Sequence, residues 1–140
     1  MYRMMRKVMV FGSFDVLHPG HLYLFSEAKK KGDKLIVVVA RDATIKRIKG
    51  KAPSYDEKKR LSSVREIPSV DEVFLGSLDD EYRIIRNVKP DMICLGHDQQ
   101  AFTENLRSYL QSIGLDTDIC RLDAYKRDVY RSSRMKELDY

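Results

Sequence analysis

Short apolar segments alternate along the chain with longer segments in which apolar residues recur at helical spacing. The apolar segments predict five strands, at Lys7–Phe11, Leu35–Ala40, Val73–Leu75, Met92–Leu95 and Asp118–Leu122. Because the second of these segments is apolar at every position, it is typical of a central parallel strand that is covered on both faces.

Helices are predicted between these strands, at 19–31, from 54 onward, at 80–88 and at 102–113. Pro19 is favoured in a first helical turn, and Gly32 is expected to end that helix. Ser54 followed by Glu57 is typical of a capping box. The polar and basic segment 41–53 in front of it is predicted as a loop.

The regular alternation of strand and helix predicts an α/β protein. We expect one domain over residues 1–140, with a Rossmann-like, open five-stranded parallel sheet and helices on both faces. Sheets of this kind bind ligands beyond the carboxyl ends of their strands, where the strand order changes direction. Conspicuous polar residues follow the predicted strands at 12–15, 40–42, 76–77, 96–98 and 123–125, so we expect the functional site at this edge.

The 140 residues include 26 Lys and Arg against 21 Asp and Glu, a formal net charge of +5. This balance favours anionic partners such as phosphorylated small molecules, nucleic acid or acidic membranes. The apolar segments are far shorter than the roughly 20 residues of a membrane span, and the basic N-terminus lacks the apolar segment of a signal peptide. Two cysteines, Cys94 and Cys120, are too few for a disulfide-stapled secreted scaffold. We therefore expect free thiols and a cytoplasmic protein.

The segment Gly12-Ser-Phe-Asp-Val-Leu-His-Pro-Gly-His21 lies between the first strand and the first helix, where a phosphate site belongs. Gly12 and Gly20 allow close approach of the backbone to a ligand, and a helix N-terminus favours anions. His18 and His21 are three residues apart, so both rings can face one phosphate group. Two alternatives stay open: capping or surface histidines, and a zinc site, for which no Cys or carboxylate cluster completes four ligands.

The same segment resembles the HxGH signature of the nucleotidyltransferase superfamily, in its cytidylyltransferase-like group. The resemblance covers nearly the whole chain, with matching positions at 39–42, 46–51, 60, 70–73, 89–91 and 95–99. The chain is most similar to the archaeal FAD synthases, which are FMN adenylyltransferases, in Val-Ala-Arg-Asp42, in Leu-Gly-x-Asp-Gln99, and in Tyr125 followed by Ser132 and Ser133. Glycerol-3-phosphate cytidylyltransferases are expected to have a tryptophan-containing loop and an Arg-Thr-Glu-Gly-Ile-Ser-Thr segment. This sequence has no tryptophan and lacks that segment.

The resemblance implies transfer of AMP from ATP to FMN, which yields FAD and pyrophosphate. Because the attacking phosphate oxygen is already ionised at neutral pH, this reaction needs alignment and charge neutralisation of phosphates rather than a general base. The alternatives are CTP-dependent cytidylyl transfer to glycerol 3-phosphate or a related alcohol phosphate and, outside the enzymes, a basic nucleotide-binding or RNA-binding module. We expect ATP and FMN as partners, neither nucleic acid nor a membrane, and a homodimer, since relatives commonly form dimers.

The resemblance also implies roles for single residues, some of which have a structural alternative. The implied catalytic residues are His18, His21 and Lys46; the nucleotide-binding residues are Ser13, Phe14, His18, Pro19, Gly20, His21, Asp98 and Tyr125; and Arg60, Ser132 and Ser133 are candidates for binding phosphate. Arg60 fits a salt bridge on the helix surface equally well, and Asp15 either orients a histidine, holds a metal-bound water or fixes its turn. Most of the basic residues near Lys46, among them Arg47, Lys49 and Lys51, are predicted to form a solvated positive surface, while one lysine, Lys46 first, is expected to reach the triphosphate or the acceptor phosphate. A divalent cation, Mg²⁺ by default, is expected to arrive with the nucleotide.

Overall fold

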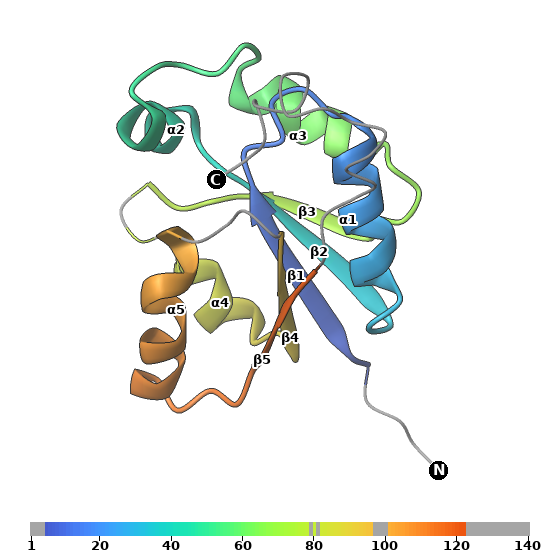
Figure 1. The fold of residues 1–140 in the computed structure, drawn as a ribbon, viewed down its shortest axis with the longest axis vertical. Coiled ribbons are helices and arrows are strands. Elements are labelled where there is room, and N and C mark those ends of the chain that lie inside the picture. The colour runs from blue at the N-terminus through green and yellow to red at the C-terminus, as the bar shows by residue number, and fades with distance from the viewer. Residues whose placement is uncertain (1–4, 79, 81, 97–100, 123–140) are drawn as a thin grey trace.

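The computed structural model describes residues 5–78, 80, 82–96 and 101–122, with residues 101–104 as backbone only (Figure 1). In these ranges the elements are β1 (Lys7–Gly12), α1 (Pro19–Lys29), β2 (Lys34–Val39), α2 (Asp42–Lys49), α3 (Glu57–Arg65), β3 (Glu72–Leu75), α4 (Arg83–Val88), β4 (Met92–Leu95), α5 (Ala101–Ser112) and β5 (Asp118–Arg121). None of these helices is long and apolar enough to cross a membrane.

The five predicted strands form one sheet in the order β3-β2-β1-β4-β5, and every neighbouring pair is parallel. β1 is central, with Val10 opposite Val37 of β2 on one side and Cys94 of β4 on the other. The prediction of an open five-stranded parallel sheet is therefore confirmed.

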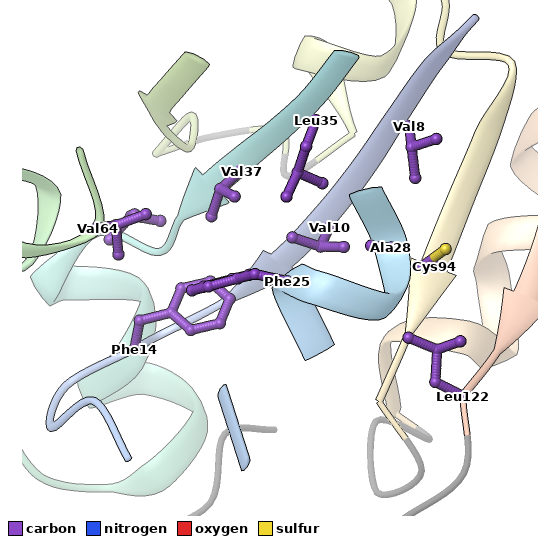
Figure 2. Close-up of a cluster of buried hydrophobic side chains, with 11 residues drawn as sticks. Val8, Val10, Phe14, Phe25, Ala28, Leu35, Val37, Val64, Cys94 and Leu122 are labelled. Atoms are coloured by element: carbon purple, nitrogen blue, oxygen red, sulfur yellow. The ribbon is translucent and has the colours of Figure 1, made fainter. Parts of the chain in front are cut away.

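Alternating side chains along the strands divide the core into two clusters, one on each face of the sheet. Val8 and Val10 of β1 belong to a cluster with side chains of α1 and α3, which Figure 2 shows, whereas Met9 and Phe11 belong to a cluster with side chains of α4 and α5. Helices thus cover both faces (Figure 1), which explains why the central strands are apolar throughout.

Two local predictions about the segment after β2 are wrong. Residues 42–49 form the helix α2, which ends at Gly50 with a left-handed φ of 80°, where a loop was expected. The N-cap of α3 is Asp56, whose carboxylate accepts a hydrogen bond from the Lys59 N–H at 2.8 Å. Ser54 therefore forms no capping box with Glu57, and the two residues have other partners, described below.

Gly32 and Cys94 are both explained by close packing. α1 ends at Lys29, and a Cβ atom on Gly32 would lie 2.7 Å from a methyl group of Val8 and 2.8 Å from the Arg6 carbonyl oxygen, so Gly32 permits close approach rather than ending the helix. Cys94 is fully buried and lies opposite Cys120 in the β4–β5 register. Burial, together with the neighbouring thiol, raises the pKa of Cys94 to about 12, which keeps it protonated and unreactive at neutral pH.

Candidate functional site

The strand order places the topological switch point between β1 and β4. The chain leaves β1 for α1 on one face of the sheet and leaves β4 for α5 on the opposite face, so the two connections diverge (Figure 1). Open parallel sheets bind ligands at such a point. The segment that carries the histidine pair begins there, directly after β1.

Phe14 gives the loop after β1 its shape. Its ring is buried beside the Phe25 ring (Figure 2), with the two centroids 5.1 Å apart. The His21 ring lies 5.3 Å from it, edge to face. A Cβ atom on Gly12 would lie 2.6 Å from this ring, so the glycine is required by packing inside the protein. The Phe14 backbone has a φ of 50°, a left-handed conformation that bulky residues rarely adopt. The Phe14 side chain is thus core, and only its backbone can serve a ligand.

His18 and His21 are brought together at the N-terminus of α1. Their rings stack with centroids 3.8 Å apart and planes inclined by 21°. His18 is the N-cap residue, and its Nδ1 accepts a hydrogen bond from the Gly20 N–H at 3.1 Å. The capping alternative is therefore confirmed for His18, but it does not compete with a phosphate role. An Nδ1 that accepts leaves the proton of the neutral imidazole on Nε2, which makes Nε2 a hydrogen-bond donor.

Pro19 and Gly20 serve this helix start in different ways. Pro19 occupies the first turn, where its missing N–H costs no helical hydrogen bond. The Gly20 N–H is engaged by His18, so Gly20 contributes to the cap.

Arg60 of α3 is buried, and its side chain has no exposed surface. Each of its three guanidinium nitrogens donates hydrogen bonds: Nε to the Tyr55 carbonyl at 2.9 Å, Nη1 to the Ser13 and Ala40 carbonyls, both at 2.8 Å, and Nη2 to the Asp42 carboxylate at 2.6 Å. The alternative of a salt bridge on the helix surface is wrong. Arg60 does pair with Asp42, but its guanidinium is directed into the protein. It joins the loop after β1, the end of β2, the start of α2 and the segment before α3.

The α2 helix directs a different lysine toward the site from the one the sequence favours. Both Lys46 and Lys49 are exposed on α2, but it is Lys49 whose Nζ lies 3.5 Å from Ser13 Oγ, in the loop after β1. Lys49 itself is exposed, but it follows the buried Ile45 by four residues, so it lies on the side of α2 that borders the core. Once segment 42–49 is recognised as a helix, this spacing is the signal that identifies Lys49.

Two carboxylates hold the segments around the site by accepting hydrogen bonds from backbone N–H groups. Asp15 accepts hydrogen bonds from the N–H groups of Ser54 at 2.6 Å and Tyr55 at 2.8 Å. Glu57 accepts one from the Asp42 N–H at 2.9 Å and also pairs with Arg41 at 3.0 Å. Of the alternatives for Asp15, the loop-fixing role is the one that these contacts support.

The remaining predicted site residues, Asp98, Tyr125, Ser132 and Ser133, lie outside the described residues. Among residues 5–78, 80, 82–96 and 101–122, no three His, Cys, Asp or Glu side chains come together as a potential metal site. These residues do not fit a protein-held metal cage, and we derive no step through one.

Sequence comparisons give consistent results. Residues 9–138 match the family model described as Cytidylyltransferase-like. Curated relatives named FAD synthase, from Methanoculleus marisnigri and Thermoplasma acidophilum, are each 41% identical to this chain over 133 residues, which cover 95% of the chain and 88% and 93% of the relatives. A third, from Methanohalophilus mahii, is 44% identical over 118 residues, 84% of this chain and 82% of that relative.

Two solved structures are also similar. One, described as the lipopolysaccharide core biosynthesis protein from Thermoplasma volcanium, has a TM-score of 0.82 and 42% identity, covering 88% of this chain and all of that one. The other, a pantoate-beta-alanine ligase from Francisella tularensis, has a TM-score of 0.63, covering 100% of this chain and 64% of that one. Its identity is 15%, so this second likeness concerns the fold alone.

Proposed function

Because this chain belongs to the cytidylyltransferase-like family, and within it to the FAD synthases, we propose that it transfers the adenylyl group of ATP to FMN, giving FAD and pyrophosphate. The observation that carries the proposal is the identity of about 41% to FAD synthases over 95% of the chain. The stacked histidine pair at the switch point of the sheet supplies the matching chemistry.

In the proposed reaction a phosphate oxygen of FMN attacks the α-phosphorus of ATP, and the bond to the β,γ-pyrophosphate breaks. Negative charge builds up on the α- and β-phosphates, so hydrogen-bond donors and cations at that place lower the barrier. His18 donates from Nε2, His21 lies stacked beside it, and Lys49 adds a cation from α2 beside Ser13. No side chain has to remove a proton, because the FMN phosphate is ionised at neutral pH.

The proposal is tested by identifying the products chromatographically. The purified chain is incubated with Mg²⁺ and each pairing of ATP or CTP with FMN or glycerol 3-phosphate. We expect FAD from ATP and FMN. A cytidylylated glycerol phosphate without any FAD would overturn the assignment in favour of the cytidylyl alternative, and no product in any mixture would favour a binding module.

Three finer properties are part of the proposal. Mg²⁺ accompanies the triphosphate, so EDTA is expected to abolish turnover and added Mg²⁺ to restore it. The protein is a homodimer, which light scattering tests by a mass twice that of one chain. We also propose a cytoplasmic location, since ATP and FMN are needed together; cell fractionation tests this placement.

A further inference from the structure

We propose that Arg60 is a positioning residue, which fixes the peptide between Ser13 and Phe14 so that the Phe14 N–H is presented to the phosphates of the nucleotide. This inference rests on the proposed function, since it assigns the ligand of that N–H to the triphosphate of ATP. It replaces the direct phosphate contact that the sequence suggests for Arg60.

Arg60 is too deeply buried to contact a nucleotide directly. A guanidinium with no exposed surface does not reach a ligand that arrives from solvent, and its three nitrogens already donate to three carbonyl groups and a carboxylate. Buried arginines need such partners, because an unpaired buried charge is strongly unfavourable. Arg60 therefore acts on the site through the groups that it holds.

The hydrogen bond from Arg60 to the Ser13 carbonyl fixes the direction of the Phe14 N–H. In a planar trans peptide the C=O and the following N–H point in opposite directions. The Ser13 carbonyl accepts a hydrogen bond from the buried Arg60 Nη1 at 2.8 Å, so the Phe14 N–H is directed away from that guanidinium. The cation beneath the carbonyl also polarises the peptide, which makes this N–H a better donor to an anion.

Phe14 has an unusual backbone conformation that the contacts on both sides of it maintain. A bulky residue with a φ of 50° is held in place by its surroundings. Arg60 fixes the peptide in front of Phe14, and the Asp15 carboxylate behind it binds the N–H groups of Ser54 and Tyr55. The Tyr55 carbonyl accepts from Arg60 Nε at 2.9 Å, which closes a ring of contacts around Phe14. Removing the guanidinium group removes the hydrogen bonds to the Ser13 and Tyr55 carbonyls and so interrupts this ring of contacts.

The test compares Arg60→Lys with wild type in binding of Mg²⁺–ATP without FMN, by calorimetry well below the melting temperature of each protein. Lysine keeps the charge but cannot hold four acceptors in one plane. We expect the Kd for ATP to rise about tenfold or more in Arg60→Lys, as for loss of a hydrogen bond to a charged group. In FAD synthesis the KM for ATP is expected to rise while that for FMN stays the same. A merely structural role would lower the amount of folded protein and leave both KM values unchanged.

The matched control is Arg65→Lys, the same substitution at an exposed position near the end of α3, for which we expect wild-type affinity. If Arg60→Lys binds ATP as tightly as Arg65→Lys, the inference is wrong. If Arg60→Lys does not fold, ¹⁵N NMR of wild type decides: ATP should shift the Phe14 amide proton downfield, and an unshifted amide overturns the inference. Wild type that binds ATP but makes no FAD contradicts the proposed function alone.

Discussion

The two ends of the sheet use carboxylates in the same way but for different purposes. At the amino ends of the strands, an aspartate stands directly before each of β2, β3 and β4 and binds one residue in or directly before a neighbouring strand twice, by its N–H and by its carboxylate. The pairs are Asp33 with Arg6, Asp71 with Leu35, and Asp91 with Lys7, and each carboxylate accepts the partner's N–H at 2.7 to 2.8 Å. At the carboxyl ends, Asp15 and Glu57 instead bind the N–H groups of loops and of a helix start.

This difference separates stability from function within one small sheet. The aspartates at the amino ends fix the register of rigid strands, where no ligand is expected. The charges at the carboxyl ends fix segments that would otherwise be free to move, and those segments carry His18, Lys49 and the Phe14 backbone. We therefore expect substitutions at one end to change kinetics and substitutions at the other end to change stability.

The largest expected effect comes from the histidine pair. His18→Asn retains a side-chain acceptor for the helix N-cap but loses the imidazole donor. His21→Ala removes the second ring. We expect each to lower kcat by about 100-fold or more, as for loss of one donor to a developing phosphate charge, with the circular dichroism spectrum unchanged. Full activity in both variants would remove the catalytic role of the pair.

The next effect distinguishes two lysines on one helix. Lys49→Ala is expected to lower kcat/KM by about 10-fold or more, because Lys49 Nζ lies beside Ser13. Lys46→Ala is the matched variant, three residues earlier on the exposed surface of α2. The sequence resemblance favours Lys46 and the geometry favours Lys49, so steady-state kinetics of the two variants decides between them. A larger loss in Lys46→Ala would restore the first assignment.

At the opposite end, Asp71→Asn is expected to lower the free energy of unfolding by about 1 kcal/mol while leaving kcat/KM unchanged. The substitution weakens the acceptor for the Leu35 N–H and removes the ion pair with Lys29, which is partly exposed. Urea denaturation measures the first quantity and FAD formation the second. A tenfold fall in kcat/KM would contradict the separation of the two ends.

The fold could be predicted from the sequence because β1, β2 and β4 are almost entirely apolar segments of parallel-sheet type and alternate with helical segments. The helix α2 could not be predicted, because most of its surface is solvated and its N-cap residue, Arg41, makes no side-chain capping bond. The predicted capping box at Ser54 does not form, because the Ser54 N–H donates its hydrogen bond to the carboxylate of Asp15, which is 39 residues away in the sequence. Local patterns do not reveal such a competitor.

The same distinction between local and long-range contacts decides which site residues could be predicted. The histidine pair could be predicted because a four-residue motif at a helix start contains all of its geometry. The role of Arg60 could not, because its partners Ser13 and Ala40 lie 47 and 20 residues away in the sequence. A single arginine in an amphipathic helix has the same pattern whether it faces water or the core.

The smallest expected effect is a pH dependence confined to the amino ends. Burial by itself raises the pKa of Asp71, but the hydrogen bond from the Leu35 N–H and the neighbouring lysines outweigh it and lower the pKa below its ordinary value of 3.8. A lowered pKa means that the unfolded chain binds the proton more readily, so this carboxylate stabilises the fold above pH 3.8, and that stability is lost as the pH falls through the folded-state pKa. The difference in unfolding free energy between wild type and Asp71→Asn should therefore be full at pH 7 and smaller at pH 3. Other carboxylates titrate in both proteins and cancel in this difference, so an equal difference at the two pH values would show that the charge of Asp71 contributes nothing.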